Sequence, residues 1–501
     1  MNNFRLLKKF CCLVLLFIMF VACFQGLVAC GKDDYIKKTA KKLSTYNIEA
    51  GYDDVTKIVS AVLTCEYKND NEAVLEQLKF HLYPNAYREN AKNKLVSSNL
   101  ITYAYKNGYS YGHIEVKSVK VNGDAVAYEI SGTDNDILIA PLSTQLYPDE
   151  KVSVEIEFET KLANIWHRLG YGDNTVNLNN WYPILCYYDK TEGWLTDPYY
   201  SVGDPFVSGI ANYNVNLSVN SNLIVACGAD LTDKQVNEST TRYCFSAVAV
   251  RDFSIIMSSA FLTDTVKGGN TTITYYYFND QNHLNTLNIA LDALNYFNNS
   301  FGTYPYDTLS VVQSDFYQGG MEYPRLVMVS AGQQESSYKK ATVHEIAHQW
   351  WYALVGNDQV RNAWMDEGLT EFSTMLFFEN HDYGIDAVND IKTAKTSLNN
   401  FLDITRNYYK NIDTSINRSV NSYRNETEYA YMCYVKAMIM FDDIRVIMGN
   451  VKFVKALKDY FNNNKLCLAV PANLIQSFSK AYGSNMESLF DTYLTGKEKT
   501  I

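Results

Sequence analysis

Two histidines four residues apart impose the strictest condition on how this chain folds. They are His344 and His348, in the stretch TVHEIAHQWW (residues 342–351). Side chains four apart on an α-helix lie on the same face one turn apart, so both imidazoles can bind one cation. Glu345 lies between them and is free to act as a base on water held by that cation. The pattern therefore predicts a helix that carries part of a zinc site, with one zinc ion per chain.

A third ligand and an orienting group follow in the segment WMDEGLTEF (residues 364–372). The segment predicts a second amphipathic helix. The residues of its apolar side are Trp364, Leu369 and Phe372. Glu367 would complete a His2Glu site, which leaves one coordination position open for water or substrate. Glu371, one turn further, would hydrogen-bond the distal nitrogen of His344 and fix its tautomer. The alternative is a pair of ordinary amphipathic helices with exposed charges.

Together, these two segments resemble the zinc aminopeptidases of the aminopeptidase N family, a branch of the gluzincins. The stretch QGGMEYPRLV (residues 318–327) is also similar to the family's GxMEN exopeptidase motif, with Tyr323 standing where the family has Asn. The matching residues are Gly319, Gly320, Met321 and Glu322. The resemblance implies that the glycines and Met321 line the substrate with their backbone, as an added strand. It further implies that Glu322 binds the free α-ammonium. The family also uses an amide or acid from its β domain near this amine, and Asn174 is the nearest candidate.

The stretch YVKAMIMFDDIRVIMG (residues 434–449) resembles the family's Tyr-x-Lys-Gly segment, with Ala437 where Gly is usual. The resemblance implies that Tyr434 is the tyrosine whose hydroxyl stabilises the oxyanion of the transition state. The neighbouring Tyr429 and Tyr431 remain alternatives for this role. All four stretches occur in the family's order, and a weaker likeness runs from about Trp181 to the C-terminus.

The first 30 residues have the composition of an export signal. Basic residues come first, a run of apolar residues extends from Phe10 to Phe24, and LVAC ends at Cys30. LVAC followed by Gly resembles the lipobox of bacterial lipoproteins, so we expect Cys30 to be lipidated and the protein to be anchored at the extracytoplasmic face of the cell membrane. The alternatives are an uncleaved membrane anchor, simple secretion, and lipidation at Cys23. Residues 31–48 are polar and lysine-rich and predict a tether.

The net charge of −11 argues against one class of partner. Proteins that bind nucleic acids carry a basic footprint, and this chain is acidic overall. We therefore expect no nucleic-acid partner. The net charge says little about the substrate itself.

The remaining chain divides into two parts, and the predicted fold class is α+β. From residue 49 to 261, short alternating apolar runs separated by Gly, Asn and Asp predict a large antiparallel β domain. From residue 262 to 501, the strand patterns TTITYYYF, LSVVQSDF and RLVMVS occur with helical patterns, which predicts a mixed α/β domain. The helical patterns, besides the zinc helix, are His283 to Phe301, Glu367 to Glu379, and Tyr434 to Met448. The resemblance implies a saddle-like first domain and a thermolysin-like catalytic second domain.

These observations predict a membrane-tethered zinc aminopeptidase that removes N-terminal residues from peptides with a free N-terminus. Glu345 would serve as the base. A carboxylate at Glu322 would favour substrates with a free ammonium, because an internal peptide would leave that buried charge unpaired. Two alternatives remain: a thermolysin-like endopeptidase, favoured if Tyr323 alters the amine site, and a non-catalytic lipoprotein that binds peptides.

Overall fold

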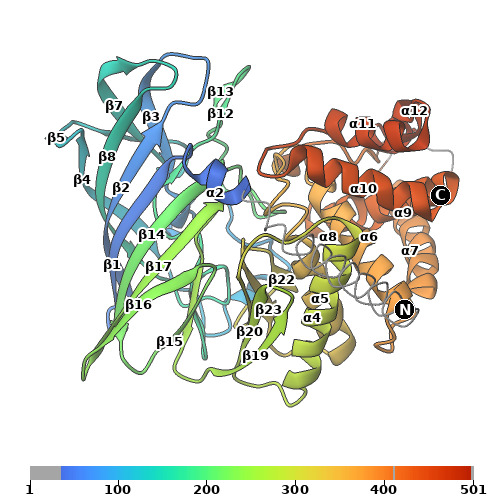
Figure 1. Cartoon of the computed structure of the whole chain (residues 1–501), viewed down its shortest axis with the longest axis horizontal. Helices are drawn as coiled ribbons and strands as arrows, with labels where there is room; N and C mark the ends of the chain where they lie inside the picture. Colours follow the sequence, from blue (N-terminus) through green and yellow to red (C-terminus); the bar gives the residue numbers. More distant parts are fainter. Residues whose placement is uncertain (1–34, 410–411, 498–501) are drawn as a thin grey trace, which may run out of the picture.

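The computed structural model of the protein describes residues 35–409 and 412–497 (Figure 1). Two parts lie side by side: a strand-rich part, blue to green in Figure 1, and a part with one sheet and most of the helices, yellow to red. The predicted export signal, with Cys30, lies outside the described residues. Among the helices described, none combines the length and apolar character needed to cross a membrane.

The strand-rich part is built on an eight-stranded sheet in the order β16-β17-β14-β1-β2-β8-β4-β5. Buried and exposed or half-buried residues alternate along strands such as β2 (Ile58–Lys68), because one face packs on the core and the other meets water. Its pairings are antiparallel, as predicted, except for the parallel pair of β1 and β14. The other strands are β1 (Thr45–Asp53), β4 (His113–Val121), β5 (Asp124–Ala125), β8 (Lys151–Lys161), β14 (Ala211–Asn220), β16 (Asp230–Val236) and β17 (Thr240–Val250).

Smaller sheets complete this part of the molecule. One has the order β15-β18-β10-β9, another β11-β3-β7-β6, and β12 pairs with β13. Their strands are β3 (Leu75–His81), β6 (Glu129–Ser131), β7 (Ile137–Leu146), β9 (Leu169–Tyr171), β10 (Val176–Leu178), β11 (Ile184–Leu185), β12 (Tyr188–Asp189), β13 (Gly193–Trp194), β15 (Ile224–Cys227) and β18 (Ile255–Ser258).

The second part begins with a five-stranded mixed sheet in the order β19-β20-β21-β23-β22. β19 (Leu262–Gly268) starts at the residue where the sequence placed the second domain. All residues of β23 (Leu326–Ser330) are buried, which explains its unbroken apolar run. β22 (Gly320–Met321) is the edge strand, so its outer side has no strand partner in this sheet. The remaining strands are β20 (Thr271–Tyr277) and β21 (Thr308–Ser314).

Helices pack against this sheet and against one another on the right of Figure 1. The predicted helical segments are confirmed as helices, although residues 430–436 form a π-helix and not an α-helix. The larger helices are α4 (His283–Ser300), α5 (Glu335–Ala347), α6 (Trp364–Asn380), α7 (Ala387–Tyr408), the π-helix η3 (Ala430–Lys436), α9 (Ala437–Met448), α10 (Asn450–Asn464), α11 (Pro471–Tyr482) and α12 (Glu487–Leu494). The short ones are α2 (Tyr35–Ala40), η1 (Tyr83–Tyr87), α3 (Ile101–Ala104), η2 (Val420–Ser422) and α8 (Glu426–Tyr429).

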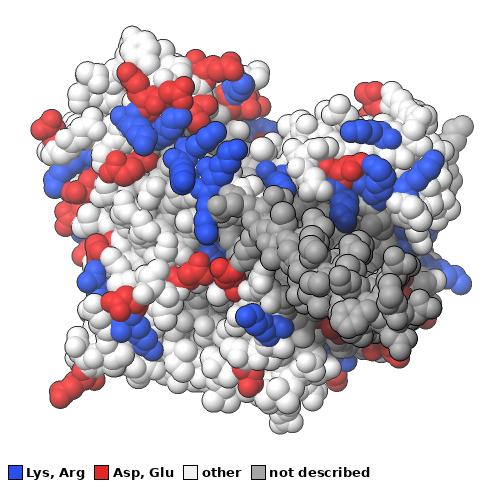
Figure 2. Space-filling model, viewed as in Figure 1, with Lys and Arg blue, Asp and Glu red and all other residues white. Residues whose placement is uncertain are grey.

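The predicted tether, residues 31–48, is wrong over most of its described length. Residues 35–40 form α2, and Ile36 is buried. The Asn212 side chain donates to the Ala40 carbonyl, and β1 already begins at Thr45 inside the main sheet. One apolar contact and backbone pairing therefore fix a segment whose lysines made it read as a solvated linker. Basic side chains gather over α2 and the strands beside it (Figure 2).

The prediction of an amphipathic helix around Glu367 is also wrong in one respect. Nearly every residue of α6 from Trp364 to Phe378 is buried, including the charged Asp366 and Glu367. The helix packs against α5, α7, α9 and η3. It therefore has no face toward water over most of its length, and its polar residues point into a site inside the molecule.

Candidate metal centre

A cavity of about 400 Å³ lies at the junction of the two parts. Elements α5, α6, α8, β22 and η3 of the second part line it, and the strand-rich part contributes Leu100, Gly203 and Asp204. Sites for small ligands typically measure about 300–1,000 Å³. The cavity is therefore large enough to hold a residue or two of a peptide.

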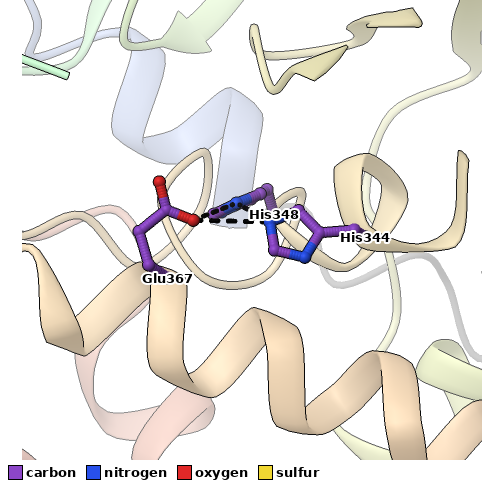
Figure 3. Close-up of side chains that lie close together, drawn as sticks. All are labelled: His344, His348 and Glu367. Carbon is purple, nitrogen blue, oxygen red and sulfur yellow. Dashed lines mark hydrogen bonds and ion pairs between the residues drawn. The ribbon is translucent and has the colours of Figure 1, made fainter. Parts of the chain in front are cut away.

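Three side chains meet at the base of this cavity, as the sequence predicted. The Nε2 atoms of His344 and His348 lie 3.1 Å apart. Each lies 3.3 Å from Oε2 of Glu367 (Figure 3). His348 is the first residue after α5, but its backbone is still helical (φ −60°, ψ −16°), so the one-turn offset between the histidines is preserved.

Both histidines are held from behind by acceptors at their Nδ1 atoms. Nδ1 of His344 lies 3.0 Å from Oε2 of Glu371, the contact expected from the sequence. Nδ1 of His348 lies 2.9 Å from the Trp351 carbonyl and 3.1 Å from Oγ1 of Thr370. A proton on each Nδ1 leaves the Nε2 lone pairs free for a cation. The contacts to His348 could not be read from the sequence, because one of them is a backbone group.

The donor set fits zinc. Ligands arranged tetrahedrally at about 2.0–2.1 Å from the ion lie about 3.3 Å from one another, close to the separations found here. Two imidazoles and one carboxylate leave a fourth position, which faces the cavity. Glu345 borders that position: it lines the cavity, and its Oε2 is buried without a hydrogen-bond partner among the described residues. Burial raises the pKa of Glu345 to about 7, while the two histidines oppose this shift.

The edge strand β22 brings the predicted substrate-binding residues against Glu345. Gly320 and Met321 pair with Val329 and Met328 of β23. A Cβ placed on Gly320 would lie 2.3 Å from Oε1 of Glu345, so only glycine permits this approach. The Gly319 carbonyl accepts hydrogen bonds from the Ser330 amide and the Gln333 side chain, which fix the start of the strand. These hydrogen bonds hold β22 to the sheet on the side of β23 only.

Glu322 enters the same cavity and is nearly fully buried, with 3% of its surface exposed. Its carboxylate accepts a hydrogen bond of 3.1 Å from Gln359, which also donates to Asp366 at 2.8 Å. Oxygen atoms of Asp204, Glu322 and Glu367 lie within 4.8 Å of one another. Burial, and then the charge of Asp204, raise the pKa of Glu322 well above its usual range. A cation in this corner would relieve that repulsion.

Asp204 is a site residue that the sequence analysis missed. It comes from the strand-rich part, and the buried Arg168 holds it through a 2.6 Å ion pair. The candidate named for this position, Asn174, is wrong: its backbone amide and side chain both donate to Asp315, and it does not line the cavity. No local motif marks Asp204, since its partners are distant in the sequence.

Tyr323 does not enter the amine corner. Its ring is fully buried, its hydroxyl lies 3.3 Å from the Asn180 side chain of the strand-rich part, and it does not line the cavity. Its carbonyl accepts from Gln349. Tyr323 therefore contributes to the contact between the two parts, and Glu322 is still directed into the cavity.

Tyr434 projects from the π-helix η3 to the edge of the ligand set. Its hydroxyl donates a 2.5 Å hydrogen bond to Oε1 of Glu367, and its ring stacks on His344. Of the two alternatives, Tyr431 pairs with Ser397, away from the ligands. Tyr429 lines the cavity, but its hydroxyl has no hydrogen-bond partner among the described residues. Tyr434 is thus the one of these three whose hydroxyl contacts a predicted ligand.

The chain is similar to known proteins in part of its sequence and in its fold. Residues 285–493 match the peptidase family M1 domain. The M1 zinc metallopeptidase from Deinococcus radiodurans has a similar crystal structure (15% identity, TM-score 0.64, covering 92% of this chain and 95% of that one). So does a mutant from the same organism with a bound Tyr-Ser-Ala substrate (14% identity, TM-score 0.65, the same coverage).

A third similar structure is a mutant two-domain M1 zinc metallopeptidase with bound L-arginine (15% identity, TM-score 0.64, covering 91% of this chain and 94% of that one). At these identities the structural likeness establishes the α+β fold with its β-rich first domain. All three similar structures are of M1 zinc metallopeptidases. With its match over residues 285–493, the chain carries a peptidase family M1 domain, and its fold is similar to that of M1 zinc metallopeptidases.

Proposed function

We propose that this peptide hydrolase is an aminopeptidase, which releases single residues from the free N-terminus of peptides. The observation that carries the proposal is the pair of buried carboxylates, Glu322 and Asp204, beside the ligand Glu367. A free α-ammonium placed between them would form charge-assisted hydrogen bonds. An internal peptide bond brings no cation, so the charge of Glu322 would stay buried without a counter-ion, which costs several kcal/mol.

Peptide binding would extend from this corner along β22. As an edge strand, it offers unpaired backbone groups to which an extended peptide can add. The ammonium at Glu322 would then fix the first residue, and its carbonyl would lie next to the histidines. The distance between Glu322 and the metal ligands would then determine which peptide bond is cleaved.

The reaction would use the chain's groups as follows. Zinc, when bound, supplies a Lewis acid that polarises the scissile carbonyl and lowers the pKa of water. Glu345, whose Oε2 has no hydrogen-bond partner in the described part of the chain, takes the proton of the attacking water and delivers it to the leaving amine. Tyr434 turns its hydroxyl from Glu367 toward the developing oxyanion, where one such hydrogen bond is worth about 3 kcal/mol of the barrier.

Blocked and free peptides test the exopeptidase assignment. We expect the parent protein to release the first residue of free peptides and to leave N-acetylated peptides uncut. Glu322→Ala should lower kcat and raise KM for free peptides, because the amine is the anchor, and should discriminate far less between the two kinds of peptide. Asp204→Asn, which keeps the size of the side chain beside Arg168, should act in the same direction.

The contrary result is equally clear. If the parent cuts acetylated peptides as fast as free ones, or cleaves internal bonds without releasing single residues, the protein is a thermolysin-like endopeptidase. Binding of peptides without any chelator-sensitive hydrolysis would instead favour the non-catalytic peptide-binding lipoprotein.

We also propose that a lipid on Cys30 anchors the protein to the extracytoplasmic face of the cell membrane. The LVAC-Gly sequence at residues 27–31 supports this assignment. Exposed lysines lie close behind it in the sequence, at positions 37, 38, 41 and 42. Seven residues of chain reach at most about 25 Å, so a lipid at Cys30 would keep this basic segment near the membrane surface.

Metabolic lipid labelling tests the anchor. We expect label in the parent and none in Cys30→Ala, which should leave the membrane fraction, while Cys23→Ala should behave like the parent. Retention of Cys30→Ala in the membrane without label would show that the apolar run from Phe10 to Phe24 is an uncleaved anchor.

A further inference from the structure

A second cavity, of about 590 Å³, continues the first one away from Glu322. The two cavities share part of their walls. The residues that line both are Leu100, Lys340, Glu371, Glu426 and Ala430. Residues of α5, α6, α7, α8, η3 and α9 line the second cavity, together with Asn99 and Leu100 of the strand-rich part. It therefore continues the active-site groove toward the helices.

The direction of this groove follows from the contacts of the two histidines. Oxygens of Glu322 and Glu345 lie within 4.8 Å of His348, whereas His344 contacts Glu371. A line from the amine corner to the second cavity thus crosses the ligand set. A peptide held by its ammonium at Glu322, with its first carbonyl at the histidines, would direct its remaining residues toward Glu371 and into the second cavity.

The walls of the second cavity are suited to apolar side chains. Beyond the shared residues, its lining includes Met375, Ala394, Val435 and Met438. The cation on its rim, Lys340, is already paired with Asp390 at 2.6 Å, and Glu371 is engaged with His344. Acidic side chains of a substrate would meet Glu371 and Glu426 here, so the charge of the lining disfavours acidic residues.

We infer that the second cavity binds the second and third residues of the substrate and selects peptides of three or more residues with apolar side chains at those positions. This inference rests on the proposed function, which orients the peptide. It predicts that kcat/KM rises about tenfold or more from an aminoacyl arylamide or a dipeptide amide to a tri- or tetrapeptide with leucine at both positions, because burial of a leucine side chain is worth at least this factor. Glutamate at the same positions should remove the gain.

The chain offers matched variants on one helix. Ala394 is half-buried and lines the cavity, whereas Thr396 is exposed and does not. Two positions along α7 correspond to a rotation of about 200°, so the two side chains lie on opposite sides of the helix. Ala394→Trp should remove most of the advantage of the tetrapeptide and leave the aminoacyl arylamide rate within about twofold. Thr396→Trp should change neither rate.

A second variant and a binding measurement secure the test. Thr393→Trp introduces its bulk at an exposed lining position, where it cannot disturb the core, and should act like Ala394→Trp. Affinity for the uncleaved tetrapeptide, measured by calorimetry on Glu345→Gln, should fall about tenfold or more with either lining substitution and stay unchanged with Thr396→Trp.

The outcomes separate this inference from the proposed function. If the parent cleaves aminoacyl arylamides but gains nothing from longer peptides, and the lining and control variants behave alike in both assays, the second cavity is no substrate site and the aminopeptidase assignment stands. If acetylated and free peptides react equally but the lining variants still weaken tetrapeptide binding, the cavity binds peptide and the exopeptidase assignment fails.

Discussion

Gly320 sets the distance between the proposed base and the strand that would bind substrate. An added Cβ would lie 2.3 Å from Oε1 of Glu345, far inside van der Waals contact. The neighbouring Gly319 has no atom within 4 Å of the corresponding position. Steric contact with Glu345 therefore requires glycine at position 320 but not at position 319, and alanine substitutions can test this difference.

Gly320→Ala should lower kcat/KM about 10- to 100-fold, because the Glu345 carboxylate must move away from the attacking water, and a displacement of about 1 Å has effects of this size. Zinc content should stay at one per chain. Gly319→Ala is the matched control and should stay within about threefold of the parent. Equal rates for the two variants would show that Glu345 has room to move.

Glu345→Gln should keep one zinc per chain and lose turnover by about 10²–10⁴-fold, the usual contribution of a general base. The amide keeps the size of the side chain but cannot accept the proton of water at neutral pH. Metal analysis beside steady-state rates provides the measurement. Retention of more than a few per cent of the activity, or loss of the metal, would contradict the role of Glu345 as base.

The sequence predicted the residues of the metal centre that lie close together in one motif, and it missed those that tertiary packing supplies. His344, His348 and Glu367 could be found because a helix fixes their spacing. Asp204 and Gln359 reach the site from separate loops, one of them in the other part of the molecule. A local sequence pattern carries no information on contacts between residues that are distant in the sequence.

At the scale of elements, α6 and α9 contact each other at a glycine opposite an alanine. A Cβ on Gly368 would lie 2.5 Å from the Cβ of Ala437. Ala437 stands where the Tyr-x-Lys-Gly segment that this stretch resembles has Gly, and here the missing side chain of Gly368 makes room for it. The contact lies directly behind Glu367, so the packing of these helices positions a zinc ligand.

Gly368→Ala should destabilise the protein by about 1–2 kcal/mol, because overpacking costs about 1–3 kcal/mol and the better helix propensity of alanine returns about 0.5–1 kcal/mol. Ala437→Gly alone should cost a comparable amount through a cavity and lost propensity. The double variant should lie close to the parent, since the small residue has only changed sides. Urea unfolding measures all three, and additive losses in the double variant would exclude this pairing.

Periodicity predicted most strands and helices correctly, and its failures have one cause. α6 is buried on nearly all sides, so its sequence does not have the exposed polar face that an amphipathic pattern assumes. The lysines of α2 made the segment look solvated, although one buried isoleucine holds it in place. The residues of the π-helix around Tyr434 give no sign in the sequence that would distinguish it from an α-helix. In each case the surrounding elements decide the conformation, and the local pattern does not.

At the scale of the whole molecule, Arg251 joins the two parts. It follows β17 and is buried, with 2% of its surface exposed. Its guanidinium donates to the carbonyls of Ser208, Tyr352 and Cys467, which belong to three distant segments. Tyr352 follows Trp351, whose carbonyl orients His348. One side chain of the strand-rich part thus supports the loop behind a metal ligand.

Arg251→Met should therefore lower the free energy of unfolding by about 3 kcal/mol or more, because three buried carbonyls lose a charged donor and each such bond contributes about 1.5–3 kcal/mol before relaxation. The loop from Trp351 would lose a support, so zinc affinity should fall as well. The control is Arg242→Met on β17 itself, which removes an exposed ion pair with Glu49 and should cost less than about 1 kcal/mol. Urea unfolding together with zinc titration against a competing chelator distinguishes the two variants. If Arg251→Met matched Arg242→Met in both measurements, the contact between the two parts would not depend on this side chain, and the metal centre would be held by the second part alone.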